Sequence, residues 1–412
     1  MAAYGNLSPS LPPTARLNQF TLTRFVFSLI YAVISIAITK AFSSLFPQPK
    51  IPWPKSKSTN PESDDKSNLP LLGTLTIVTG ANSGVGYEIA KAQFQKGSIV
   101  VLGCRNKERG QQAIHHILKQ SNISPSDTIS SKRLRMITLD TVSLDSVREF
   151  VRTFKELYPD RKVNYLFLNA GIVKKPHNAN PFTPDGLEYM YATNFLGQFL
   201  LTGLLSSSFS DSIRIISTSS DGAFQASLDP KLAIQGPGKP EENSNLSKYQ
   251  VEVGFHTASL NPIFDTFLRI IKLDLFNQYG QTKAMQVAFS NIIQNRFDLA
   301  AKESGIARRR FAAAFHPGFV ATNIFKGLFT PDQKFALSFA QSVIRLIAIT
   351  PKEGAQAGLW LAHTYDARPG AFYDRDIEIV LPWYKSYDDQ LADRLWQRWN
   401  NDAGLKESDW SF

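Results

Sequence analysis

The pattern of hydrophobic and polar residues divides the chain into four stretches of different character. Residues 1–24 are mostly polar, and the run from Phe25 to Thr39 that follows contains no charged residue. Residues 47–70 carry six prolines among serine, aspartate and lysine residues, which is typical of an extended spacer. From Leu71 onward, short apolar runs alternate with longer amphipathic ones, which predicts a folded domain.

The alternation after Leu71 indicates the class of that domain. Strand, helix and strand in repetition predict an α/β domain over residues 71–375, with a doubly wound parallel sheet covered by helices on both faces. Residues 376–412 are expected to form a C-terminal tail. The expected strands are residues 75–78, 98–102, 134–139, 165–168, 213–216 and 311–315.

The uncharged run near the N-terminus is almost long enough to cross a membrane. Its 15 residues reach roughly 22 Å in a helix, which is short of the ~30 Å hydrocarbon core. If Lys40 snorkels, the helix continues to Phe46 and its 22 residues span the bilayer. We therefore expect a membrane-anchor helix at residues 25–46, with a cleaved signal peptide and a buried or interfacial helix as alternatives.

The charges that flank this segment predict its orientation. Arg16 and Arg24 precede it, whereas lysines follow it at positions 40, 50, 55 and 57. By the positive-inside rule, the bulk of the protein then faces the cytosol. We expect it on the endoplasmic reticulum membrane or on lipid droplets.

Composition excludes several classes of protein. The chain of 412 residues is 43% hydrophobic and 19% charged, so it can bury a large core and is not intrinsically disordered. Cys104 is the single cysteine, which excludes an intrachain disulfide and favours a cytosol-facing domain. The six histidines show no metal-ligand spacing, so we expect no metal site.

The net charge of +10 raises the question of an acidic partner. The basic residues are scattered, and the densest cluster, Arg308–Arg310, directly precedes an apolar strand-like run. No nucleic-acid-binding motif is present, so we expect no nucleic acid partner. Anionic lipid, a phosphorylated cofactor and a simply solvated basic surface all remain as explanations.

A glycine-rich loop follows the first expected strand. The sequence TGANSGVG, from Thr79 to Gly86, leads directly into a helical pattern. Glycines 80, 84 and 86 stand where backbone N–H groups must approach a pyrophosphate, and the helix N-terminus adds partial positive charge. This arrangement predicts a dinucleotide site, with a purely structural tight turn as the alternative.

The end of the second expected strand bears on the choice of cofactor. A free ribose 2′-hydroxyl usually meets an acid there, but the sequence is Cys104, Arg105, Asn106, Lys107. Arg105 can fork onto a 2′-phosphate through two hydrogen bonds. The sequence therefore predicts NADP(H) rather than NAD(H), unless Arg105 is a solvated strand-end residue.

Seven ordered motifs between residues 72 and 375 resemble those of the short-chain dehydrogenase/reductase family, whose sheet has the Rossmann form. They are TGANSGVG (79–86), LDTVSLDSV (139–147), LNAG (168–171), TNFLGQFLLT (193–202), RIISTSS (214–220), YGQTK (279–283) and HPGFVAT (316–322). The resemblance implies catalytic Tyr279, Lys283, Ser220 and Asn194. For the cofactor it implies Gly80, Asn82, Ser83, Gly84, Val85, Gly86, Arg105, Asp140, Asn169, Ala170, Gly171, Tyr279, Lys283, Pro317, Gly318, Val320 and Thr322.

The pattern Tyr-x-x-x-Lys, which places two side chains on one helix face, occurs three times. Tyr87 and Lys91 belong to the helix after the glycine loop, and Tyr158 precedes a proline in a turn-like break before the fourth strand. Only Tyr279 and Lys283 follow the fifth strand and open a long helical pattern. We therefore assign the catalytic pair to them.

These residues would carry out carbonyl reduction or its reverse. Free tyrosine has a pKa of about 10, and nearby positive charge, from Lys283 with the bound nicotinamide, is expected to lower it. Tyr279 would then serve as acid or base, while Ser220 holds the substrate oxygen. Asn194 would hold a helix distortion or a water, or be a satisfied buried amide. The choice of Ser220 over Ser219 rests on alignment, and His316 is interpreted as a packing or loop residue.

The chain departs from the family pattern between the serine and the tyrosine, which stand 59 positions apart. Residues 221–275 are interpreted as an insertion that contributes to the substrate pocket or touches a membrane. The apolar segment 335–349 stands where the family keeps its substrate lid, and it predicts a greasy substrate, a second membrane contact or a plain core helix.

The leading hypothesis is an NADP(H)-dependent oxidoreductase of lipophilic ketones and alcohols, such as steroids or retinoids. The sequence resembles retinol dehydrogenase-like and 3-ketosteroid reductase-like members, and a tailoring ketoreductase of secondary metabolism is an alternative. A non-catalytic membrane-bound scaffold is a hypothesis of another class, which the retention of all four catalytic residues disfavours. Family members often pair through helices, so a homodimer is expected by analogy only.

Overall fold

A computed structural model of the chain describes residues 70–123, 127, 132–173, 179–226, 274–305, 309–318, 320, 348–381 and 387–412. The expected anchor at 25–46, most of the 221–275 insertion, Thr322 and most of segment 335–349 lie outside these residues. Within the described part, no helix combines the length and the apolar character needed to cross a bilayer.

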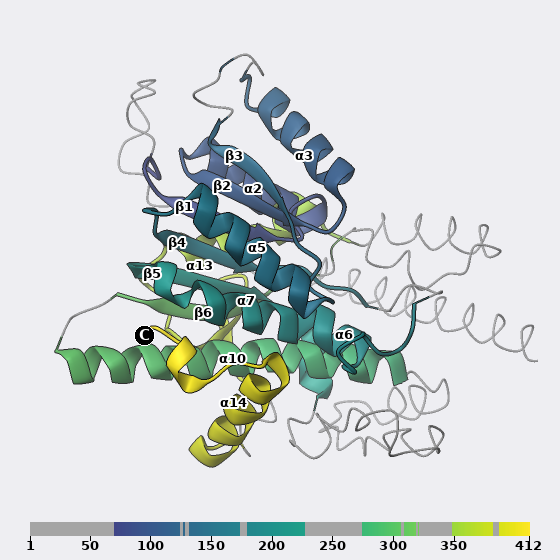
Figure 1. The fold of residues 1–412 in the computed structure, drawn as a ribbon, viewed down its shortest axis with the longest axis vertical. Helices are drawn as coiled ribbons and strands as arrows, with labels where there is room; N and C mark the ends of the chain where they lie inside the picture. The colour runs from purple at the N-terminus through teal and green to yellow at the C-terminus, as the bar shows by residue number, and fades with distance from the viewer. Residues whose placement is uncertain are drawn as a thin grey trace, which may run out of the picture.

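The centre of the fold is one sheet with strand order β3-β2-β1-β4-β5-β6-β7-β8 (Figure 1). Strands β1 to β7 are parallel, and β8 pairs antiparallel with β7. The strands are β1 (Leu75–Thr79), β2 (Ile99–Cys104), β3 (Leu134–Thr138), β4 (Val163–Leu168), β5 (Phe209–Thr218), β6 (Phe311–His316), β7 (Phe372–Asp374) and β8 (Ile377–Ile379). The expected doubly wound parallel sheet is thereby confirmed.

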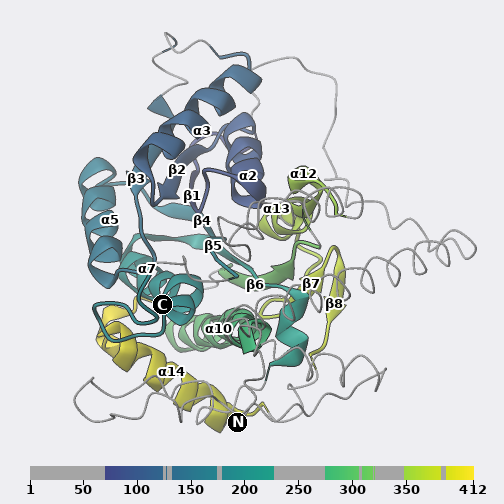
Figure 2. The same ribbon diagram turned by 90° about the vertical axis from the view of Figure 1, so that its right-hand side faces the viewer.

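Helices cover both faces of this sheet (Figure 2). One face carries α2 (Gly84–Gln95), α3 (Lys107–Gln120), α12 (Pro351–Gly354) and α13 (Gln356–His363). The other carries α5 (Leu144–Leu157), α6 (Tyr189–Tyr191), the π-helical turn η2 (Ala192–Leu196), α7 (Gly197–Leu205) and α10 (Asp274–Ser304). Short turns at η3 (Ser206–Ser208), η4 (Asp221–Gln225) and η8 (Glu407–Asp409) complete the described elements, together with α14 (Asp389–Ala403).

The helix boundaries follow from capping side chains. Asn106 accepts a hydrogen bond from the backbone N–H of Arg109 at 2.7 Å and begins α3, and Ser143 accepts one from the backbone N–H of Ser146 at 3.2 Å and begins α5. Thr350 and Glu353 form a reciprocal capping box at the start of α12. These local signals place the helix N-termini at the edge of the sheet where the strands end.

The core consists of two apolar clusters, one on each face of the sheet. The first packs Phe150, Phe199 and Phe289 from α5, α7 and α10 against the strands. The second packs Ile89, Ile117 and Leu361 from α2, α3 and α13 against the other face. Because β1, β2 and β6 are covered on both sides, nearly all of their residues are buried.

The C-terminal residues contribute to this core. Helix α14 lies against α7 and α10, and its Trp396 and Trp399 are buried among Phe195, Phe199 and Phe289. Asp388 caps the start of α14, and Gly404 ends it in the left-handed conformation (φ 63°). Residues 387–412, which the sequence assigned to a tail, therefore pack as part of the domain.

Candidate active site

The glycine loop lies between β1 and α2, at the carboxyl edge of the sheet. Gly80 (φ 67°) and Gly84 (φ 62°) adopt the left-handed conformation that favours glycine. Gly86 has no room for a side chain, because a Cβ there would lie 2.4 Å from Asn169 Nδ2 and 2.7 Å from the carbonyl oxygen of Gly80. The loop is thus folded tightly against the end of β4.

Thr79 fastens this loop to the neighbouring strand. Its hydroxyl oxygen accepts hydrogen bonds from the backbone N–H groups of Asn169 (2.8 Å) and Ala170 (2.9 Å), and it donates to Gln198 Oε1 at 3.0 Å. The amide of Asn169 donates to the carbonyl oxygen of Thr79 at 3.0 Å. Sequence reasoning assigned no role to Thr79 or Gln198, because their partners stand up to 119 positions away.

The start of α2 fits an anionic group. Ser83 is the N-cap residue, but its side chain makes no capping hydrogen bond, and the first turn contains no acidic residue. The first N–H groups of a helix have no intrahelical partner and carry partial positive charge. Together with the glycines of the loop, this donor set suits a pyrophosphate of a dinucleotide.

Arg105 and Asp140, which the sequence assigned to the cofactor site, lie at the ends of β2 and β3. Cys104 directly precedes Arg105. Arg105 directly follows β2 and is exposed, and Asp140 lies just beyond β3 with Oδ1 accepting from the backbone N–H of Val142 at 3.3 Å. Burial raises the pKa of Cys104, the last residue of β2, to about 12. The thiol is therefore neutral and inert at neutral pH.

The loop after β6 lies close to the start of α2. Gly318 is left-handed (φ 82°) and lies against Ile349. A Cβ on Gly354 would lie 2.6 Å from Val320, 3.1 Å from the carbonyl oxygen of Pro317 and 3.3 Å from Val85. Pro317, Val320 and Val85 are thereby brought together around Gly354, the last residue of α12.

Lys283 is buried beside Tyr279 in helix α10. Its side chain is 3% exposed, and its Nζ lies 5.5 Å from the ring centroid of Tyr279. The ammonium donates to the carbonyl oxygen of Thr218 (2.8 Å) and to Gln286 Oε1 (3.1 Å). Gly171 belongs to the same group, because a Cβ on it would lie 3.4 Å from Lys283 Nζ and from Asn194 Oδ1.

Asn194 lies within the π-helical turn η2, where the regular helix is interrupted. Its side chain accepts from the backbone N–H of Ile172 (2.7 Å) and donates to the hydroxyl of Thr282 (3.0 Å). The main-chain carbonyl oxygen of Asn194 accepts a hydrogen bond from Gln286 Nε2 at 2.8 Å. A chain of hydrogen bonds through Gln286 therefore connects Asn194 to Lys283.

The structure distinguishes the two neighbouring serines. Ser219 is buried, and its hydroxyl donates to the main-chain oxygen of Lys283 at 2.8 Å. Ser220 instead lies close enough to Tyr279 to lower its pKa, and the Ser220 hydroxyl donates to Asp221 Oδ1 at 2.8 Å. Of the two, Ser220 is the one that shares a site with Tyr279.

Burial shifts the pKa values of Tyr279 and Lys283. Burial, the largest cause, raises the pKa of Tyr279 to about 12; the hydrogen bond to Ser220 lowers it and the carboxylate of Asp221 raises it. Burial also lowers the pKa of Lys283 to about 7. Burial disfavours the charged form of both side chains. The lowering of the Tyr279 pKa by Lys283 with the bound nicotinamide stays a prediction.

The two other tyrosine–lysine pairs lie away from this group. Tyr87 and Lys91, in α2, both contact Gln120 at the end of α3, and Lys91 forms an ion pair with Glu88. Tyr158 ends α5, while Lys162 stands before β4. Neither pair lies at the carboxyl edge near β5.

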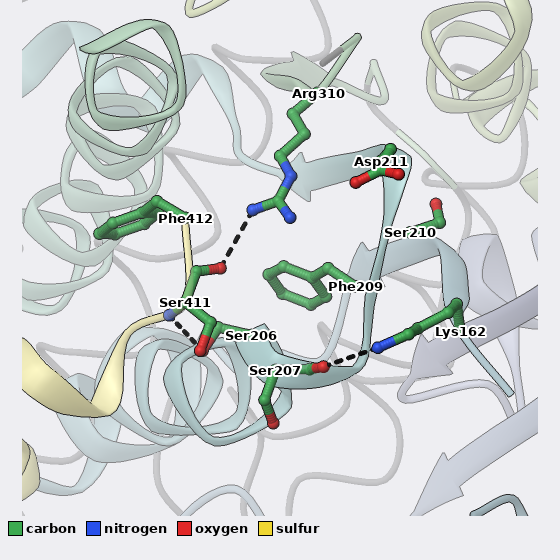
Figure 3. A pocket seen from close by; sticks show the side chains of 9 residues that line it. All are labelled: Lys162, Ser206, Ser207, Phe209, Ser210, Asp211, Arg310, Ser411 and Phe412. Atoms are coloured by element: carbon green, nitrogen blue, oxygen red, sulfur yellow. Dashed lines mark hydrogen bonds between the residues drawn. The ribbon is translucent and has the colours of Figure 1, made fainter. Parts of the chain in front are cut away.

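A cavity of about 450 Å³ lies at the opposite, amino-terminal edge of the sheet (Figure 3). Lys162 donates across it to the carbonyl oxygen of Ser207 at 3.0 Å, and Arg310 donates to that of Ser411 at 3.0 Å. Lys162 directly precedes β4 and Arg310 directly precedes β6. Ser220, in contrast, lies beyond the carboxyl end of β5, as does Tyr279. The cavity is therefore separate from the candidate active site.

Comparison with known proteins identifies the family to which the chain is similar. Residues 74–229 match the family described as short chain dehydrogenase. Retinol dehydrogenase 11 of Homo sapiens is 34% identical over 332 residues, which cover 80% of this chain and 86% of that protein. Retinol dehydrogenase 13 of Mus musculus is 27% identical over 333 residues, covering 80% of this chain and 83% of that protein.

A solved structure has the same fold. An uncharacterised protein from Mycobacterium paratuberculosis matches with a TM-score of 0.52 at 20% identity, covering 82% of this chain and 97% of that one. At this identity the likeness concerns the fold alone. With a relative 34% identical across most of its length, and the family's motifs in order along one sheet, the chain belongs to the short-chain dehydrogenase/reductase family.

Proposed function

We propose that this oxidoreductase transfers a hydride between NADP(H) and a lipophilic ketone or alcohol, such as a steroid, a retinoid or a similar lipid. The observation that carries the proposal is the contact of Ser220 with Tyr279, one helical turn from the buried Lys283. These three side chains come from the end of β5 and from α10, and they lie at the edge of the sheet where the glycine loop begins.

The side chains of the chain itself supply orientation and the proton. Tyr279, with its pKa raised to about 12, is protonated at neutral pH and can donate to a carbonyl oxygen. Ser220 can hydrogen bond to the same oxygen and stabilise the charge that develops on it. The nicotinamide cofactor, when bound, supplies or accepts the hydride.

Lys283 and Asn194 support these two residues. Lys283 ties α10 to Thr218 at the end of β5, so it fixes the position of Tyr279 relative to Ser220. With a pKa of about 7, Lys283 can gain or lose a proton near neutrality. The hydrogen bonds from Lys283 to Gln286, and from Gln286 to the main-chain oxygen of Asn194, hold the lysine in place against the neighbouring helix.

The preference for NADP(H) is supported by Arg105. Its side chain is exposed at the end of β2, and no hydrogen bond or ion pair joins it to the other described residues. No acid stands at this position to accept hydrogen bonds from a free ribose 2′-hydroxyl. An arginine that is free to turn suits the 2′-phosphate of NADP(H).

The lipophilic substrate and the membrane attachment are supported by the sequence and by the names of the relatives. Two of the similar proteins are called retinol dehydrogenases, and retinol is a lipid. Residues 25–46 have the length and apolar character of an anchor. We propose that they hold the catalytic domain on the cytosolic side of the endoplasmic reticulum or of lipid droplets.

The test is turnover by the full chain in detergent micelles. NADPH oxidation is followed with a panel of steroid, retinoid and long-chain ketone or aldehyde substrates. We expect Tyr279→Phe to lower the rate by about 10²- to 10⁴-fold while NADPH still binds. Tyr87→Phe, from the second tyrosine–lysine pair, is the matched control and should keep full activity. Absence of both NADPH binding and turnover, or full activity in Tyr279→Phe, would contradict the proposal.

A further inference from the structure

Asp221 places a carboxylate directly beside the candidate catalytic serine. The Ser220 hydroxyl donates to Asp221 Oδ1 at 2.8 Å, and its oxygen accepts from the backbone N–H of Gly222 at 3.2 Å. The backbone N–H of Asp221 donates to His316 Nδ1 at 3.2 Å. The hydroxyl proton of Ser220 is thus directed toward Asp221, which leaves an oxygen lone pair for Tyr279.

A close backbone contact holds Asp221 against Tyr279. The turn η4, which begins at Asp221, packs on α10. A Cβ on Gly280 would lie 2.6 Å from the carbonyl oxygen of Gly222, so only glycine permits this approach. A Cβ on Gly222 would in turn lie 3.4 Å from the ring of Tyr279. These two glycines therefore let the backbone next to Asp221 pack closely against Tyr279.

Several titratable groups lie around this contact. His316 faces it from β6, and Asp374 and Arg375 lie near His316 on β7 and the turn after it. Burial is the main cause that lowers the pKa of His316, so its ring is neutral and accepts a hydrogen bond from Asp221. Lys283, from α10, turns its ammonium toward Thr218 and Gln286 instead.

We propose that Asp221 is a positioning residue that keeps Tyr279 in its protonated form by holding the Ser220 hydroxyl and by repelling a phenolate. The proposal rests on the function proposed above. The negative charge of Asp221 acts against a phenolate at Tyr279, whereas a hydrogen bond from Ser220 stabilises it. Because the Ser220 hydroxyl donates to Asp221, the carboxylate competes with the phenolate for that proton. Both effects raise the free energy of the phenolate relative to that of the neutral phenol.

The consequence concerns the two directions of the reaction. In reduction, Tyr279 would give its proton to the substrate oxygen, and the bound cofactor would supply the hydride to the substrate carbon. The phenolate that remains regains a proton from solvent. In oxidation, Tyr279 must first lose its proton, so oxidation reaches its full rate only at alkaline pH. Asp221 thereby keeps the enzyme ready to donate a proton across neutral pH.

The first test needs no substrate. The phenolate of Tyr279 is titrated by ultraviolet absorbance, as the difference between the full chain and its Tyr279→Phe variant. The same difference is measured in the Asp221→Asn background, where the side chain can still accept from Ser220 but carries no charge. We expect the pKa of Tyr279 to fall by roughly one pH unit, which is a tenfold increase of the phenolate fraction at a given pH.

Two further variants make the result specific to the charge at this position. Asp221→Glu keeps the carboxylate and should keep the pKa of Tyr279 close to that of the unchanged chain. Asp160→Asn removes an exposed carboxylate before β4, at the opposite edge of the sheet, and should not move it. An unchanged or higher pKa in Asp221→Asn overturns the proposal. The same is true of an equal fall in Asp160→Asn.

The second test uses the reaction itself. The pH at which the oxidation rate reaches half of its maximum should fall by roughly one pH unit in Asp221→Asn and stay in place in Asp160→Asn. A failure of the proposed function appears as absent turnover in the unchanged chain, and the absorbance titration still shows whether Asp221 raises the pKa of Tyr279. Turnover in the unchanged chain with an unmoved pH profile in Asp221→Asn overturns the role of Asp221 alone.

Discussion

The ammonium of Lys283 donates to the carbonyl oxygen of Thr218, 2.8 Å away, and so ties α10 to the last residue of β5. The contact is buried, and burial lowers the pKa of Lys283 from 10.5 to about 7. Burying an ionisable lysine in this way lowers the stability of the fold, but it fixes the position of α10 and places a titratable group in the site.

Lys283→Met should show this cost as a pH-dependent difference in stability. Between about pH 7 and pH 10.5 the unfolded chain holds a proton on Lys283 that the folded chain has released, so the contribution of Lys283 to stability rises with pH. The methionine variant lacks this dependence. Its free energy of unfolding relative to the unchanged chain should therefore fall by about 1.4 kcal/mol for each pH unit in that window.

Urea unfolding between about pH 6 and pH 9 measures this difference. Lys91→Met is the matched control, because Lys91 lies at the surface of α2 in an ion pair with Glu88. Its stability relative to the unchanged chain should not depend on pH in this range. Parallel curves for Lys283→Met and the unchanged chain would show that Lys283 keeps an ordinary pKa.

Substitutions of the two serines that follow β5 should have different effects, one mainly on turnover and the other mainly on stability. Ser220→Ala removes the hydroxyl that contacts Tyr279, so we expect turnover to fall by about 10²- to 10³-fold with little change in melting temperature. Ser219→Ala removes a buried hydrogen bond to α10 and should cost about 1 kcal/mol of stability. Equal rate losses in the two variants would contradict this division.

Arg105→Ala should weaken NADPH binding without affecting NADH. A lost bidentate contact with a 2′-phosphate corresponds to about a 10- to 100-fold higher Kd. Arg161→Ala removes an equal charge from the exposed turn before β4 and should change neither affinity. Calorimetric titration of both variants with both nucleotides measures these affinities, and an equal loss for NADH would assign Arg105 to another role.

The sequence predicted the six longer parallel strands because each contains a short run that is mostly apolar, which is typical of a strand in a covered parallel sheet. Strands β7 and β8 escaped prediction, since three residues each are too few to form a pattern. Helix α14 was missed although its buried residues Leu391, Leu395 and Trp399 recur every four positions. Attention to that spacing would have identified a helix in place of a tail.

The site residues divide in a similar way. Tyr279, Lys283 and the loop glycines stand in short motifs, so the sequence alone could propose them. Thr79, Gln286 and Asp221 act through partners that are distant in the sequence, such as Asn169 for Thr79 and His316 for Asp221. The protonation states depend on burial, which only the folded structure provides.

Trp399→Ala tests how far α14 supports the site. The indole is fully buried, and its ring centroid lies 4.5 Å from that of Phe195, which directly follows Asn194 in the π-helical turn. Truncation should cost about 3–5 kcal/mol of stability. Leu157→Ala, at a half-exposed position ending α5, should cost far less. Denaturant unfolding compares the two, and equal losses would show that α14 is only loosely packed.

Gly86→Ala should damage the cofactor loop. The added Cβ would lie 2.4 Å from Asn169 Nδ2, and that amide cannot move freely because it donates to the carbonyl oxygen of Thr79 at 3.0 Å. The start of α2 must therefore move away from β4, which displaces the N–H groups that suit a pyrophosphate. We expect the Kd for NADPH to rise at least about tenfold, which is about 1.4 kcal/mol. Lys91→Ala, on the outer side of the same helix, should leave the Kd unchanged. If Gly86→Ala binds NADPH as tightly as the unchanged chain, the dinucleotide does not lie on this loop.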